Sequence, residues 1–83
     1  MHKILIVEDD PQISSLLQSY LEKYGYQGVV VSNFDQVLST FQEVKPDLVI
    51  LDVNLPRFDG FYWCSQIRTQ STCPILFVSA RDD

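Results

Sequence analysis

Carboxylate side chains follow two of the apolar runs in this chain, where they could bind a divalent cation. Glu8 and Asp9 come directly after residues 4–7, and Asp52 comes directly after residues 48–51. Short, unbroken apolar runs rich in β-branched residues are typical of strands that are buried on both faces of a parallel sheet. Because ligands bind beyond the carboxyl ends of such strands, we expect the three carboxylates to meet at one edge. Crowded carboxylates repel one another unless a cation neutralises them, so the sequence predicts a cation site.

Strand and helix patterns alternate along the chain and predict its fold class. The predicted strands cover residues 3–7, 29–31, 48–51 and 75–78. Strands that alternate with helices indicate right-handed βαβ crossovers, and therefore an α/β fold with a doubly wound parallel sheet in the order βαβαβαβ. With 83 residues and no repeat or linker, the chain is expected to form one domain.

The first predicted helix has clear signals at both ends. Asp10 is a plausible N-cap before Pro11, and Gly25 ends the helix. Its apolar stripe, which we expect to face the core, consists of Ile13, Leu16, Leu17, Tyr20, Leu21 and Tyr24.

The other two predicted helices are shorter. Ser32 with Asp35 resembles a capping box before the second helix, which Pro46 stops. The third helix begins at Gly60, which is the first residue of its buried stripe. Phe61 and Tyr62 lie outside this stripe. The buried stripe continues with Trp63, Cys64 and Ile67.

Composition excludes several classes of function. The net charge is -5, with eleven acidic against six basic residues, so this segment is not expected to bind nucleic acid directly. No stretch approaches the roughly 20 apolar residues of a membrane span, and the apolar run at residues 4–7 is too short for a signal peptide. We therefore expect a cytoplasmic protein. Cys64 and Cys73 lack a metal-binding spacing, and a pair in an unsecreted chain is more often reduced than bridged.

Four motifs in register resemble the receiver domain of two-component response regulators. They are Val7-Glu8-Asp9-Asp10, Leu51-Asp52-Val53-Asn54-Leu55-Pro56, Asp59-Gly60 and Val78-Ser79-Ala80. The resemblance covers the whole chain at the family's spacing. It implies a flavodoxin-like receiver fold with strand order 2-1-3-4-5.

The resemblance also implies a role for each site residue. Asp52 would accept a phosphoryl group from a sensor histidine kinase, with Mg²⁺ as cofactor. Asp9 and Asp52 would bind Mg²⁺ directly, Glu8 would bind it through water, and Asn54 would bind it through its backbone carbonyl. The side chain of Asn54 would tune the access of water to the acyl phosphate. Ser79 would be the switch hydroxyl. Such a module is no turnover enzyme and at most dephosphorylates itself slowly.

Each assignment has a structural alternative. Glu8 and Asp9 could form a solvated acidic turn, and Ser79 could be a turn hydroxyl. Asp59 is better explained as a turn or cap residue than as a ligand.

A complete receiver has five strands and five helices, so we expect residues 1–83 to be its N-terminal part, without the fifth strand, its lysine and the last two helices. Residues 75–78 would then form an exposed edge strand, which favours a homodimer or a strand-swapped oligomer. Residues 57–64, together with Ile67 and Arg68, resemble receivers of winged-helix, OmpR-type regulators that answer antibiotics such as bacitracin. That resemblance implies transcription regulation through a DNA-binding effector domain outside this segment.

Two other functions stay open. The first alternative is a Mg²⁺-dependent phosphatase with Asp52 as its nucleophile. Such enzymes typically have a second Asp two residues later, and Asn54 at that position argues against this function. The second alternative is a receiver-like interaction module that is not phosphorylated.

Overall fold

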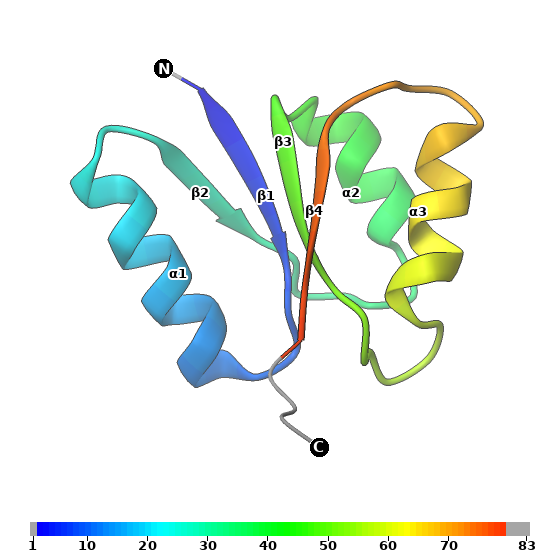
Figure 1. Ribbon diagram of the computed structural model, residues 1–83, viewed down its shortest axis with the longest axis horizontal. Helices are drawn as coiled ribbons and strands as arrows, with labels where there is room; N and C mark the ends of the chain where they lie inside the picture. Colours follow the sequence, from blue (N-terminus) through cyan, green and yellow to red (C-terminus); the bar gives the residue numbers. More distant parts are fainter. Residues whose placement is uncertain (1, 80–83) are drawn as a thin grey trace.

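A parallel sheet of four strands lies between helices in the computed structural model, which describes residues 2–79 (Figure 1). The elements are β1 (Lys3–Val7), α1 (Pro11–Lys23), β2 (Gln27–Val30), α2 (Val37–Val44), β3 (Leu48–Asp52), α3 (Gly60–Arg68) and β4 (Ile75–Val78). The strand order is β2-β1-β3-β4, and all three pairings are parallel. Helix α1 covers one face of the sheet, and α2 and α3 cover the other. The predicted doubly wound α/β fold is confirmed; Ala80 of the last motif lies outside the described residues.

The two central strands, β1 and β3, are buried on both faces by apolar residues. The larger core cluster lies beneath α2 and α3 and contains Leu5, Val7, Val31, Val37, Phe41, Val49, Leu51, Trp63 and Ile67. Ile4, Ile6 and Ile50 alternate with these residues along the strands and are also buried. Burial on both faces is the reason that the strands appear as continuous apolar runs. Cys64 and Cys73 are both free and partly buried, and they pack against the larger cluster.

Helix α1 begins and ends at the predicted residues. The side chain of Asp10 caps the helix, with Oδ1 accepting a hydrogen bond from the backbone N–H of Gln12 at 2.9 Å. Pro11 occupies the first turn, where the absent N–H costs nothing. Gly25 follows the helix with a φ of 87°, a conformation that favours glycine.

Replacing the cap should weaken the fold by a modest amount. Asp10→Ala removes the acceptor of the Gln12 N–H, so we expect the free energy of unfolding to fall by about 1 kcal/mol. Asp10→Asn keeps an oxygen acceptor and should stay close to the original stability. Urea unfolding of both variants checks the prediction, which is wrong if the two lose equal stability.

The predicted buried stripe of α1 is partly wrong. Leu16 is 69% exposed, and Tyr20 and Tyr24 are also largely exposed. The buried side instead includes Ser14 and Gln18, whose Nε2 donates to the backbone carbonyl of Gly28 at 2.9 Å. Gly28 has no side chain, so α1 can lie close to β2 at this point. The helix is therefore rotated relative to the face that apolar spacing alone predicts.

The start of α2 also differs from the prediction. Ser32 and Asp35 form no capping box, because the helix begins at Val37 with Gln36 as its N-cap residue. The side chain of Asn33 accepts from the N–H of Asp35 at 3.0 Å, and this local turn precedes the helix. At its other end α2 stops before Pro46, as predicted.

The second strand starts two residues earlier than predicted, at Gln27. The described helices include none long and apolar enough to cross a membrane.

Candidate functional site

The three predicted carboxylates meet at the carboxyl ends of β1 and β3. These strands are neighbours, with Val7 paired to Leu51, so the residues that follow them lie side by side. One carboxylate oxygen from each of Glu8, Asp9 and Asp52 lies within 4.8 Å of the others. Glu8 and Asp52 are each only 3% exposed, whereas Asp9 is exposed to solvent. Two buried acids and one open one thus form a half-open pocket of negative charge.

Backbone groups of the following loops hold the two buried carboxylates. Glu8 Oε2 accepts from the N–H of Asp10 at 3.1 Å, and Asp52 Oδ1 accepts from the N–H of Asn54 at 3.1 Å. The second oxygen of Glu8, Oε1, is buried and has no hydrogen-bond donor among the described residues, and when Glu8 is protonated it can share its proton with Asp52. Burying a carboxylate oxygen without a partner costs free energy, so this atom indicates that the pocket suits a cation.

The electrostatics of the pocket are visible in Glu8. Burial raises the pKa of Glu8 from 4.5 to about 7, and the neighbouring charges of Asp52 and Asp9 add to this rise against the lowering effect of the Asp10 N–H. At neutral pH without metal, Glu8 is therefore protonated in a substantial fraction of the molecules. A hard divalent ion with oxygen ligands, such as Mg²⁺, would take the place of that proton, and the donor set fits such an ion.

Asn54 and Ser79 lie at the same edge of the sheet as the acids. The N–H of Val53 donates to the carbonyl of Val78 at 3.1 Å, which aligns the ends of β3 and β4. Beyond them, Nδ2 of Asn54 donates to Oγ of Ser79 at 3.4 Å. All five predicted site residues therefore gather at the carboxyl edge. That the backbone carbonyl of Asn54 is a ligand stays a prediction.

Two further residues position the phosphoacceptor candidate. Asp59 is the N-cap of α3, with Oδ1 accepting from the N–H of Tyr62 at 2.9 Å, so its expected cap role is confirmed. Gly60 packs against the end of β3, where an added Cβ would collide with the carbonyl oxygen of Asp52 and lie 3.0 Å from Cα of Val53. From the sequence, Gly60 is expected only as a motif residue and as the start of a helix, without a packing role against β3. Its unfavourable helix propensity at a helix start was the signal that could have identified it.

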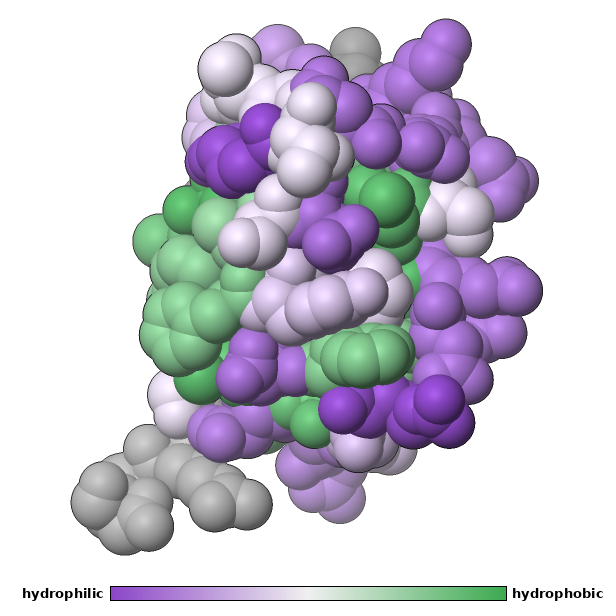
Figure 2. Space-filling view, turned by 90° about the vertical axis from the view of Figure 1, so that its right-hand side faces the viewer, coloured by the Kyte–Doolittle hydropathy of each residue, from purple (hydrophilic) through white to green (hydrophobic). Residues whose placement is uncertain are grey.

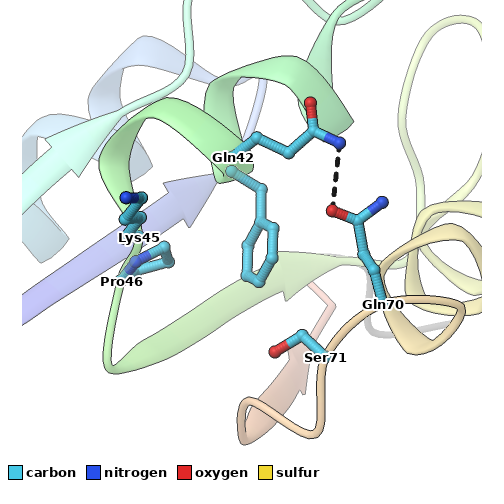
Figure 3. Close-up of a pocket in the computed structure, with 6 residues that line it drawn as sticks. Gln42, Lys45, Pro46, Gln70 and Ser71 are labelled. Atoms are coloured by element: carbon cyan, nitrogen blue, oxygen red, sulfur yellow. Dashed lines mark hydrogen bonds between the residues drawn. The ribbon is translucent and has the colours of Figure 1, made fainter.

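A separate hollow of about 410 Å³ lies at the opposite edge of the sheet, among the segments that precede β3 and β4 (Figure 3). It is lined by Phe41, Gln42, Lys45, Pro46, Gln70 and Ser71. Gln42 and Gln70 bridge it with a side-chain hydrogen bond of 3.0 Å. None of the three clustered acids lines this hollow, so it is not part of the acidic site.

Comparison with known proteins identifies the same family across nearly the whole chain. The response regulator receiver domain family matches residues 4–83. The transcriptional regulatory protein YxdJ of Bacillus subtilis is 62% identical over 81 residues, which cover 98% of this chain and 35% of that protein. The sensory transduction protein BceR of Halalkalibacterium halodurans is 48% identical over 82 residues, covering 99% and 36%. The chain thus spans about a third of the length of these relatives.

Solved structures share the fold closely. The N-terminal domain of the nisin resistance regulator NsrR, described as a lantibiotic response regulator, superposes with a TM-score of 0.90 at 43% identity, covering all of this chain and 70% of that one. The response regulator TrrA of Thermotoga maritima, crystallised with Mg²⁺ and BeF, gives 0.89 at 32% identity, covering 99% and 72%. TrrA has also been solved in complex with the histidine kinase ThkA, with a TM-score of 0.87 at 32% identity, covering 100% and 72%.

The family match, the two relatives and the fold shared with solved receivers all agree with the acidic pocket at the ends of β1 and β3. The chain belongs to the family of two-component response regulator receiver domains.

Proposed function

We propose that this chain is a phosphoacceptor module, in which Asp52 takes a phosphoryl group from a sensor histidine kinase with Mg²⁺ as cofactor. The observation that carries the proposal is the pocket in which Glu8, Asp9 and Asp52 place carboxylate oxygens within 4.8 Å of one another. Asp52 is the last residue of β3 and is 3% exposed. The unpaired Oε1 of Glu8 supports a cation there.

The reaction needs a nucleophile and neutralised charge. An oxygen of the Asp52 carboxylate attacks phosphorus, a P–O bond forms, and the P–N bond to the kinase histidine breaks with its electron pair leaving on the imidazole nitrogen. The N–H of Asn54, which donates to Asp52 Oδ1, holds one oxygen in place and leaves the other to attack. When bound, Mg²⁺ neutralises charge on the phosphoryl oxygens and the carboxylates.

Each pocket residue has a distinct part in holding the cation. Asp9 and Asp52 would ligate it directly, Glu8 would act through a bridging water, and Asn54 would contribute its backbone carbonyl. Asp9 is exposed, which suits a ligand at the open side of the pocket. In this assignment the side-chain amide of Asn54 is not a metal ligand and can act on water near the phosphoryl group. In the structure this side chain donates to Ser79 Oγ.

Ser79 would couple phosphorylation to a change of shape. Its hydroxyl can donate to a phosphoryl oxygen on Asp52, and this contact exists only in the phosphorylated state. A contact of that kind shifts a two-state equilibrium and draws the segment after β4 toward the site. The side chain of Asn54 donates to Ser79 Oγ at 3.4 Å, which leaves the hydroxyl hydrogen of Ser79 able to donate to the phosphoryl group.

The comparisons support the wider setting of this proposal. TrrA is solved both with Mg²⁺ and BeF and with a histidine kinase, which supports a kinase as partner and Mg²⁺ as cofactor here. YxdJ is a transcriptional regulatory protein about three times as long as this chain, which supports DNA binding by an effector domain outside residues 1–83 as the output. The chain covers 70–72% of the solved receivers named above, which supports residues 1–83 as the N-terminal part of a receiver domain. A cytoplasmic location follows from this role.

Phosphorylation by a small donor tests the proposal. With acetyl phosphate and Mg²⁺, we expect intact mass spectrometry to detect one added phosphoryl group on the chain. Asp52→Asn should abolish the adduct, and chelation of Mg²⁺ should reduce it to background.

A matched control separates this result from damage to the fold. Asp35→Asn removes an exposed carboxylate that pairs with Arg57 at the surface, and it should leave phosphorylation unchanged. No adduct on a sample whose circular dichroism is native would overturn the proposal in favour of an unphosphorylated interaction module. Repeated turnover of phosphomonoesters would overturn it in favour of a phosphatase.

A further inference from the structure

The hollow at the amino edge of the sheet, opposite the acidic pocket, lies between the C-terminal ends of α2 and α3. Its lining comes from the last turn of α2, the segment before β3 and the segment after α3. In the strand order 2-1-3-4-5, a fifth strand lies beyond β4, on the side away from β3, so it does not cover the space between α2 and α3. The hollow is therefore formed by described residues alone.

The floor of the hollow is apolar, and its surroundings are polar. Phe41, which is 7% exposed, and the buried Pro46 form the floor. Figure 2 shows that hydrophilic residues cover most of the upper end of the molecule, where the segments before β3 and β4 lie, and that hydrophobic surface gathers lower on this side. A small apolar floor within a polar surface suits a small molecule, whereas a protein partner would need a broad apolar area.

The rim of the hollow offers more hydrogen-bond donors than acceptors. Gln42 Nε2 donates to Gln70 Oε1 at 3.0 Å, which leaves Oε1 of Gln42 and Nε2 of Gln70 without a partner within residues 2–79. Ser71 Oγ accepts from the N–H of Cys73 at 3.0 Å and keeps its hydrogen to donate. In the same part of the chain, the ammonium of Lys45 makes no ion pair. One cation and two neutral donors against one acceptor favour an anionic ligand.

Lys45 has a backbone conformation that is unfavourable for a residue with a side chain. Its φ of 52° and ψ of 61° are left-handed, and among the described residues it is the one non-glycine with a positive φ. Glycine is the usual residue at such a helix end, because it has no Cβ to collide with the backbone. The following Pro46 adds to the restriction, since proline favours extended backbone at the preceding residue. Residues held in this way cluster at functional sites, so the side chain of Lys45 is the candidate for a function.

We propose that the hollow binds a small organic carboxylate that carries one planar apolar ring. The carboxylate pairs with the ammonium of Lys45 and accepts from Gln70 or Ser71, which stand across the hollow from Lys45 and Pro46 in Figure 3. The ring lies on Phe41. The volume of about 410 Å³ falls within the range of roughly 300–1,000 Å³ that is typical of ligand pockets. Because Lys45 is exposed, its ion pair is weak, and we expect a Kd on the order of 1 mM.

Titration with sodium benzoate tests the proposal, with neutral benzamide as the matched probe. In two-dimensional NMR spectra, benzoate should shift the side-chain amide signals of Gln42 and Gln70 and the backbone signal of Ser71, while the signals of the acidic pocket stay in place. Benzamide carries no charge to pair with Lys45, so it should bind at least about fivefold more weakly. The proposal is wrong if tens of millimolar benzoate shift none of these signals, or if benzamide binds as tightly as benzoate.

Variants of Lys45 separate a binding role from a structural one. In Lys45→Gly, glycine relieves the left-handed backbone, so the urea midpoint should rise, while loss of the ammonium should weaken benzoate binding at least about fivefold. Lys45→Arg keeps the positive charge and should bind benzoate like the original chain. Lys23→Gly, which removes a lysine from the last turn of α1, should lower the urea midpoint and leave benzoate binding unchanged. Circular dichroism checks that each variant folds. A Lys45→Gly chain that binds benzoate as tightly as the original overturns the proposal and leaves Lys45 a role only at the negative end of the α2 dipole.

Discussion

The metal-free chain is expected to lose stability as the pH rises from 4.5 to 7. Burial and the neighbouring acids raise the pKa of Glu8 from 4.5 to about 7 in the folded state. Between these values the folded chain holds a proton that the unfolded chain has released, so the folded state is favoured less as the pH increases. Below pH 4.5 and above pH 7, Glu8 does not make the free energy of unfolding depend on pH. The loss at neutral pH is on the order of 3 kcal/mol at most.

Mg²⁺ should reverse this loss, and more strongly at higher pH. The cation requires ionised carboxylates, so its affinity should increase up to about pH 7, where Glu8 gives up its proton. A ligand that binds only the folded state stabilises it by about 2.7 kcal/mol when its free concentration is a hundred times Kd. At pH 5 the same Mg²⁺ concentration should have a much smaller effect.

Urea unfolding at pH 5 and pH 7.5, with Mg²⁺ or with a chelator, measures both effects. Glu8→Gln replaces the buried carboxylate with a neutral group, so it should flatten the pH dependence of the metal-free chain and reduce stabilisation by Mg²⁺. Glu22→Gln changes an exposed glutamate on α1 and should behave like the original chain. If the original chain and Glu8→Gln have the same pH slope without metal, buried charge at Glu8 is not the cause.

The sequence predicted the strands and the gathering of the site because both depend on patterns that act locally. A strand buried on two faces must be apolar throughout, and parallel strands bring their carboxyl ends to one edge. The positions of Glu8, Asp9 and Asp52 follow from these two rules. The caps at Asp10 and Asp59 were predicted for a similar reason, since a cap bonds to the backbone only two or three residues away.

What the sequence could not predict depends on contacts between distant residues. Helix α1 turns Ser14 toward the sheet, and Gln18 donates to the carbonyl of Gly28 on β2, while Leu16 and Tyr20 stay exposed. Periodicity cannot detect such a contact, because it treats a buried serine as a polar position. The same holds for the pKa of Glu8, which depends on burial and on charge from another strand.

Gly60→Ala is expected to damage both the fold and the cation site. An added Cβ would collide with the carbonyl oxygen of Asp52 and lie 3.0 Å from the carbonyl carbon of that residue and from Cα of Val53. These are backbone atoms at the end of β3, so either the strand end or the start of α3 must move. We expect the free energy of unfolding to fall by about 2–3 kcal/mol. Because the displaced residue is Asp52, the affinity for Mg²⁺ should fall as well.

Gly25→Ala separates these two effects. Gly25 has a φ of 87° with no atom within 4 Å of an added Cβ, so alanine there is opposed by backbone conformation and not by contact. It should lower stability by about 1–2 kcal/mol while leaving the Mg²⁺ affinity unchanged, because Gly25 lies at the far end of α1 from the acids. Chemical denaturation and calorimetric Mg²⁺ titration of both variants decide the matter. If Gly60→Ala binds Mg²⁺ as tightly as Gly25→Ala does, the close approach of α3 to β3 has no part in positioning Asp52.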